Sequence, residues 1–86
     1  MKRKVLVVAQ TTEARVKTKL DLKERWNADI YTAAFEYAVG VCKEIMPCVI
    51  VICPGAGGPV VYDEIKKQIP NQRILRVGYD QLPATL

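Results

Sequence analysis

The stretch Cys48-Val49-Ile50-Val51-Ile52-Cys53-Pro54-Gly55-Ala56-Gly57-Gly58-Pro59 decides the fold class of this chain. Its six leading apolar residues, four of them β-branched, predict a strand that is buried on both faces of a parallel sheet. The glycine-rich segment that follows predicts a tight turn. Pro59 suits the first position of a helix, which we expect over residues 60–69. A strand, a turn and a helix in this order form the repeating unit of α/β proteins.

The rest of the chain repeats this alternation. Further strands are expected at residues 5–9, 30–32 and 73–77, with a turn at residues 27–29 before the second of them. The connecting helices should be right-handed crossovers, so the sheet is parallel and its simplest strand order is 2-1-3-4. We therefore predict an α/β fold with about four strands.

Two helices are expected before the central strand, over residues 13–25 and 33–46. Thr11 or Thr12 can accept a hydrogen bond from the first turn of the earlier helix and so cap it. Four large apolar residues of this region are expected to form one broad stripe that faces the core; they are Val16, Leu20, Leu22 and Trp26.

A ligand site in an open α/β sheet lies beyond the carboxyl ends of the strands, where the strand order reverses. In the order 2-1-3-4 this point falls between the first and third strands. Two loops would line the crevice there, and a third would approach it from the end of the fourth strand. The candidate binding residues are Gln10, Thr11, Thr12, Cys53, Gly55, Gly57, Gly58 and Asp80.

Length and composition limit the function classes. A chain of 86 residues supports a single small domain (residues 1–86), in which we expect residues 1–3 and 78–86 to be terminal tails. The longest apolar runs are about six residues, whereas roughly 20 are needed to cross a bilayer. The apolar stretch after the basic start is also too short for a signal peptide. We expect a cytoplasmic protein without membrane contact.

The chain has no histidine and three cysteines. The absence of histidine excludes a Ser-His-Asp triad, a Cys-His dyad and an imidazole metal site. The cysteines show no Cys-x-x-Cys spacing, so neither a zinc site nor a disulfide framework is indicated, and we expect no metal or other cofactor. Cys42 and Cys48 lie in apolar sequence and are interpreted as small core residues.

Charge is concentrated at the beginning of the chain. Residues 1–25 contain eight basic and three acidic side chains, whereas residues 26–86 contain five and six. A basic helix can meet phosphates or an acidic partner surface. However, pairs such as Glu13 and Lys17 at i, i+4 are typical of a solvated helix face, and no aromatic residues alternate with the charges. Nucleic-acid binding is therefore not expected.

Several segments carry a resemblance to a known family. Lys4-Val5-Leu6-Val7-Val8 is similar to the first strand of a response-regulator receiver domain, and Thr32-Ala33-Ala34 is similar to the opening of its second helix. Pro47 to Ile52 stands where receivers have their third strand, and Pro54 to Gly58 is similar to the loop that follows it. The resemblance covers residues 3–77. It implies the three-layer, flavodoxin-like architecture of receivers, truncated to four of their five strands.

The receiver chemistry is missing from these positions. Receivers carry a magnesium-binding acidic pair after the first strand, where this chain has Ala9 and Gln10. Their phosphoacceptor aspartate follows the third strand, where this chain has Ile52 or Cys53. The hydroxyl residue and the lysine that end later receiver strands are also absent. The resemblance thus implies a pseudo-receiver, a non-enzymatic regulatory module that works through protein contacts.

An alternative function rests on Cys53 and the glycines behind it. Backbone N–H groups in such a loop bind anions and lower the pKa of a thiol, as in thiol phosphatases and in the phosphocarriers of sugar transport. The phosphatases need an arginine where Pro59 stands, and the phosphocarriers place their cysteine where Gln10 stands. The alternative is a small-molecule or anion-binding domain, with Cys53 as the candidate for thiol-dependent phosphocarrier chemistry.

The truncated sheet also suggests a partner. Without a fifth strand, the fourth strand is an edge, and exposed edges either pair or are protected by charge. We therefore expect a homodimer, joined across this edge or across the third helix, or another protein partner. The candidate interface residues are Arg73, Leu75 and Arg76.

Overall fold

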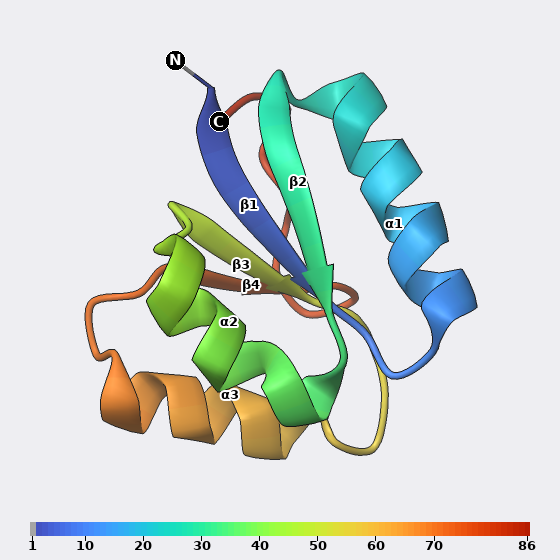
Figure 1. Cartoon of the computed structure of the whole chain (residues 1–86). Coiled ribbons are helices and arrows are strands. Elements are labelled where there is room, and N and C mark those ends of the chain that lie inside the picture. Colours follow the sequence, from blue (N-terminus) through green and yellow to red (C-terminus); the bar gives the residue numbers. More distant parts are fainter. Residues whose placement is uncertain (1) are drawn as a thin grey trace.

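The computed structural model describes residues 2–86 as an α/β structure built on one four-stranded parallel sheet (Figure 1). The strands lie in the order β2-β1-β3-β4, as predicted, which is consistent with a truncated flavodoxin-like fold. The strands are β1 (Arg3–Val8), β2 (Ala28–Ala33), β3 (Val49–Ile52) and β4 (Ile74–Arg76). The helices are α1 (Thr12–Arg25), the short 3₁₀ helix η1 (Phe35–Tyr37), α2 (Ala38–Ile45) and α3 (Gly58–Gln68).

The two central strands, β1 and β3, are buried on both faces. Because successive side chains of a strand point to opposite faces, each strand contributes to two separate apolar clusters. Val5, Val7, Val49 and Val51 face the α1 layer. Leu6, Val8, Ile50 and Ile52 face the layer formed by α2 and α3. Figure 1 shows α1 and the pair α2 and α3 on different sides of the sheet.

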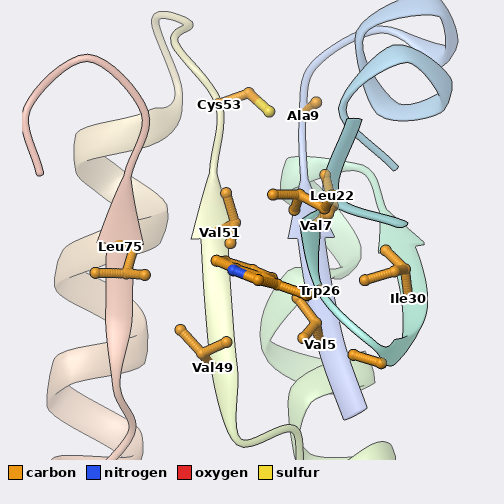
Figure 2. Close-up of a cluster of buried hydrophobic side chains, with 11 residues drawn as sticks. Val5, Val7, Ala9, Leu22, Trp26, Ile30, Val49, Val51, Cys53 and Leu75 are labelled. Atoms are coloured by element: carbon orange, nitrogen blue, oxygen red, sulfur yellow. The ribbon is translucent and has the colours of Figure 1, made fainter. Parts of the chain in front are cut away.

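The segment after β4 completes the α1 layer. Leu82 and Leu86 pack against the cluster on the α1 side of the sheet, although their segment has no regular secondary structure. The indole nitrogen of Trp26 donates a hydrogen bond of 2.8 Å to the carbonyl of Pro83. In Figure 2 the Trp26 ring lies across β3 toward β1, near the side chains of Val5, Val49 and Val51. Trp26 therefore joins α1, the sheet and the C-terminal segment.

The predicted helix over residues 33–46 is wrong in its first third. Residues 28–33 form β2, which pairs with the whole of β1 from Arg3 opposite Ala28 to Val8 opposite Ala33. The ladder continues one step further, because the N–H of Ala9 donates to the carbonyl of Ala33. Pairing with β1 thus outweighs the helix propensity of Ala33 and replaces most of the turn predicted at residues 27–29. Residues 35–37 form the 3₁₀ helix η1, so the α-helix begins only at Ala38.

The predicted apolar stripe of α1 is only half correct. Leu22 and Trp26 are each 2% exposed, but Val16 and Leu20 are 50% and 58% exposed. A helix turns about 100° per residue, so Leu20 and Leu22 lie about 200° apart and cannot face the same layer. The inner face of α1 instead follows a spacing of four residues, through Ala14, Thr18 and Leu22. None of the described helices has the length and apolarity needed to span a membrane.

Candidate functional site

At the expected crevice between the ends of β1 and β3, the ring of Phe35 lies against the glycine-rich loop. A Cβ atom added at Gly57 would lie 2.6 Å from Cδ2 of this ring, and one added at Gly55 would lie 3.0 Å from Cε2. The Cβ atom added at Gly55 would also lie 3.2 Å from Oε1 of Gln10. Two glycines of the loop are therefore in close packing with side chains of the chain itself, a contact that the sequence did not reveal because a helix was expected over residues 33–46.

Thr11 and Thr12 have structural partners at the start of α1. The hydroxyl of Thr11 accepts a 3.1 Å hydrogen bond from the N–H of Ala14, so the predicted N-cap is confirmed at this residue. Arg15 donates from Nη1 to the carbonyl of Ala9 at 2.9 Å and from Nη2 to the hydroxyl of Thr12 at 2.9 Å. These contacts fasten the end of β1 to the first turn of α1.

Cys53 lies at the end of β3 with its side chain in the α1 layer. The residue is 5% exposed, and its sulfur lies 3.3 Å from the hydroxyl of Thr18. Figure 2 shows the sulfur pointing toward Ala9, among the side chains of the apolar cluster. The thiol thus has a hydrogen-bond partner and little solvent access.

The three thiols should differ sharply in reactivity. Cys48 is exposed, so its interpretation as a core residue is wrong, whereas Cys42 and Cys53 are buried. Burial also raises the pKa of the Cys42 thiol, which lowers its thiolate fraction at neutral pH. We expect a thiol reagent to modify Cys48 quickly in the native protein and all three cysteines in denaturant, as measured by mass spectrometry of the alkylated peptides. Native modification of Cys53 at the rate of Cys48 would contradict the burial described here.

An open pocket of about 340 Å³ lies one strand away from the expected crevice, between the ends of β3 and β4. Three of the predicted site residues border it, namely Cys53, Gly55 and Gly58. Gln10, Thr11, Thr12, Gly57 and Asp80 do not. The other lining residues are Ile52, Pro54, Pro59, Tyr62, Asp63, Arg76, Val77 and Tyr79.

Arg76 is the only basic residue that lines this pocket, and its side chain is held from three sides. Its guanidinium carbon lies 4.6 Å from the ring centroid of Tyr62 and 5.3 Å from that of Tyr79. Its Nε lies 3.4 Å from Oδ2 of Asp80. Cation–π contacts to two rings and an ion pair therefore restrict the orientation of the guanidinium.

Asp80 also closes the outer edge of β4. The carbonyl of Arg73 accepts from Ile50, and the N–H of Val77 donates to Ile52, so the odd-numbered residues here direct their backbone groups toward β3. Because backbone groups alternate along a strand, those of Arg76 point away from β3. The N–H of Arg76 donates to Oδ2 of Asp80 at 2.8 Å, and its carbonyl accepts from the N–H groups of Tyr79 and Asp80.

This arrangement bears on the interface predicted at Arg73, Leu75 and Arg76. Leu75 is buried in the cluster on the α1 side, and the backbone of Arg76 is already hydrogen-bonded. Within β4, only Ile74 then offers outward-facing backbone groups to an added strand. The edge is thus protected by a turn of its own chain, which is one of the ways in which proteins avoid edge pairing.

The Asp80 contact should be visible as a pH effect. The hydrogen bond from the Arg76 backbone, helped by the Arg76 side chain, holds the pKa of Asp80 below its ordinary value. The folded state therefore favours the carboxylate, so this contact is complete above the unfolded pKa of about 3.9 and is lost as the pH falls through the lower folded pKa. We expect the carboxyl carbon of Asp80 to titrate below the ordinary aspartate range in an NMR titration.

The control for this titration is Asp80→Asn. In the unmodified protein the amide resonance of Arg76 should move together with the Asp80 carboxyl as the pH falls, whereas in Asp80→Asn it should lose that step. Titration of Asp80 at the ordinary aspartate pKa would show that the capping contact does not persist in solution.

Comparison of the chain with protein-family models, with curated proteins and with solved structures finds no match in any of the three.

Proposed function

We propose that this chain is a non-enzymatic, receiver-like module that binds a partner protein through the outer face of α1. The observation that carries the proposal is the exposure of Val16 and Leu20, which lie one helical turn apart and are 50% and 58% exposed. No other layer of the described structure covers these two aliphatic side chains, because α1 packs on the sheet through its other side, where Leu22 and Trp26 are buried. Adjacent exposed apolar side chains with a polar surround are typical of contact sites.

The basic charge of α1 favours a different, acidic protein as the partner over a second copy of this chain. α1 contains five basic and three acidic residues, and Lys17, Lys23 and Arg25 are exposed on it. Two copies of this helix face to face would bring like charges together, which disfavours association. An acidic protein surface with an apolar hollow for Val16 and Leu20 would complement both features.

The residues that stand where receivers carry their carboxylates support a role in protein contacts rather than in phosphotransfer. Where receivers carry carboxylates, this chain has Ala9, which is fully buried, Gln10, which lies against Gly55, and Cys53, which is hydrogen-bonded in the core. None of these side chains is a hard anionic ligand for magnesium or an acceptor like the receiver aspartate.

A photo-crosslinking amino acid placed at position 20 tests the proposal in the cells that produce the protein. We expect a discrete adduct with one partner protein, and no such adduct from the same amino acid at position 67, where the exposed Lys67 lies on α3. The yield at position 20 should fall in the variant Lys17→Glu/Lys23→Glu and, when the crosslinking is repeated in a lysate of these cells, on adding about 0.5 M salt, because charge reversal and screening weaken the attraction.

Two outcomes count against this function. Identical adducts from positions 20 and 67, or none from position 20, would remove α1 as the contact surface. Sedimentation velocity at micromolar concentration tests whether the partner is a second copy of this chain. We expect a monomer, whereas a dimer that the substitution Leu20→Glu dissociates would identify a second copy as the partner.

A further inference from the structure

We propose that the pocket between the ends of β3 and β4 binds a small ligand that carries a carboxylate or phosphate group on an aromatic or heterocyclic ring. The inference concerns a different surface from α1 and does not depend on the function proposed above. It rests on the side chains that meet in this pocket, above all on Arg76 and the two tyrosines that flank it.

Arg76 is prepared to bind an oxyanion. Its backbone N–H and its Nε both donate to Asp80, at 2.8 and 3.4 Å, and the rings of Tyr62 and Tyr79 flank the guanidinium. Within residues 2–86, no hydrogen bond uses its two terminal nitrogens. A planar guanidinium with two free NH₂ groups in a fixed orientation matches the two oxygens of a carboxylate or phosphate. Because the side chain is already restricted, less entropy is lost on binding.

The walls of the pocket favour a ring on the same ligand. Tyr79 is 80% exposed, and the guanidinium carbon of Arg76 lies 5.3 Å from its ring centroid, so most of the ring surface is open to solvent. Pro54 and Pro59 form apolar walls on the loop side. Aromatic rings pack in offset or edge-to-face arrangements, so a ligand ring can stack beside Tyr79 while its anionic group reaches Arg76. A volume of about 340 Å³ lies within the range of small-molecule sites.

Asp63 refines the ligand class. This carboxylate lines the same pocket as Arg76, so a ligand with charge spread over its whole surface would meet repulsion at one wall. A ligand with one anionic group and a hydrogen-bond donor at some distance from it would satisfy both residues. The arrangement therefore selects against simple inorganic anions and in favour of ring-bearing monoesters or acids.

Four probes test this inference by NMR titration of the ¹⁵N-labelled protein at constant ionic strength. They are phenyl phosphate, phenylacetate, inorganic phosphate and benzyl alcohol. We expect saturable shifts of the Gly58, Val77 and Tyr79 amides with phenyl phosphate or phenylacetate, and affinities at least roughly tenfold weaker for inorganic phosphate and for benzyl alcohol, since each lacks one of the two recognition elements. The ratio of the affinities for phenyl phosphate and phenylacetate distinguishes a phosphate ligand from a carboxylate ligand.

The variants assign the interaction to named side chains. Arg76→Lys keeps the charge but loses the planar pair of donors, and Arg76→Gln loses both; we expect affinity to fall roughly tenfold or more in Arg76→Gln and by less in Arg76→Lys. Tyr79→Ala, at an exposed position, should weaken binding of the ring-bearing probes more than that of inorganic phosphate. Arg73→Gln is the matched control, because Arg73 is exposed and does not line the pocket.

Three results would overturn the inference: no saturable shift with any ring-bearing anion, equal affinity for phenyl phosphate and inorganic phosphate, or equal weakening in Arg73→Gln and Arg76→Gln. The last would indicate general attraction of anions to a basic protein. All three leave the α1 crosslinking result untouched, so failure here and failure of the proposed function are separate.

Discussion

Replacing Trp26 by alanine is expected to lower the free energy of unfolding by about 3–5 kcal/mol. The side chain is 2% exposed and packs against both central strands, so its removal leaves a large cavity in the α1 layer. A domain of 86 residues has a total stability of roughly 4–13 kcal/mol. The substitution therefore removes a large share of that stability, which urea unfolding followed by circular dichroism would measure.

Trp26→Phe separates the packing of this residue from its hydrogen bond. Phenylalanine retains most of the buried apolar area but cannot donate to the carbonyl of Pro83. We expect a smaller loss of about 1–2 kcal/mol and a selective increase in amide hydrogen exchange over residues 82–86. If Trp26→Phe left exchange in this segment unchanged, or if Trp26→Ala cost less than about 1 kcal/mol, the C-terminal segment would not be fastened to the core as described.

The sheet was predictable because its evidence is local. Two runs, Val5 to Ala9 and Cys48 to Cys53, are short, apolar at every position and rich in β-branched residues, a pattern typical of a strand covered on both faces. With crossover helices between the strands, the handedness rule then leaves few possible strand orders. By contrast, β2 carries a weaker signal, and its full length emerges only from its six-residue pairing with β1.

The surroundings of the candidate site were not predictable in the same way. The apolar residues of α1 were correctly expected on a helix, but their angular positions divide them, so Leu22 is buried while Val16 and Leu20 are exposed. Arg76 was singled out for its charge at an edge strand. Its contacts with Tyr62 and Asp80 join α3, β4 and the turn after it, and such contacts have no fixed spacing in a sequence.

Phe35 shows the same limit at the glycine-rich loop. A loop of this composition at the end of a parallel strand has two common explanations: backbone that approaches a ligand, and backbone that approaches another part of the chain. Both need glycine at the same positions. The sequence pattern predicts a tight turn at these glycines and does not show which side chain packs against it, whereas the structure places the Phe35 ring against Gly55 and Gly57.

Substituting alanine for Gly57 tests this packing directly, and we expect a loss of about 1–3 kcal/mol in the free energy of unfolding. The backbone of Gly57 has φ −83° and ψ −7°, which alanine adopts freely, so the cost comes from the added methyl group alone. That group would lie 2.6 Å from the Phe35 ring, well inside contact distance.

Gly40→Ala is the matched control, and its effect should have the opposite sign. Gly40 lies inside α2, and a Cβ atom added there has no neighbour within 4 Å, so alanine should stabilise the protein by about 0.5–1 kcal/mol through helix propensity.

The double variant Gly57→Ala/Phe35→Leu identifies the opposing group. If the ring of Phe35 causes the cost at position 57, the two substitutions should be non-additive, with a favourable coupling of about 1 kcal/mol or more in denaturant unfolding. Additive effects, or a neutral Gly57→Ala, would mean that the ring does not rest on this glycine in solution. The crevice between β1 and β3 would then be open, and the loop from Cys53 to Gly58 would again be a candidate for binding ligands at the position expected from the topology alone.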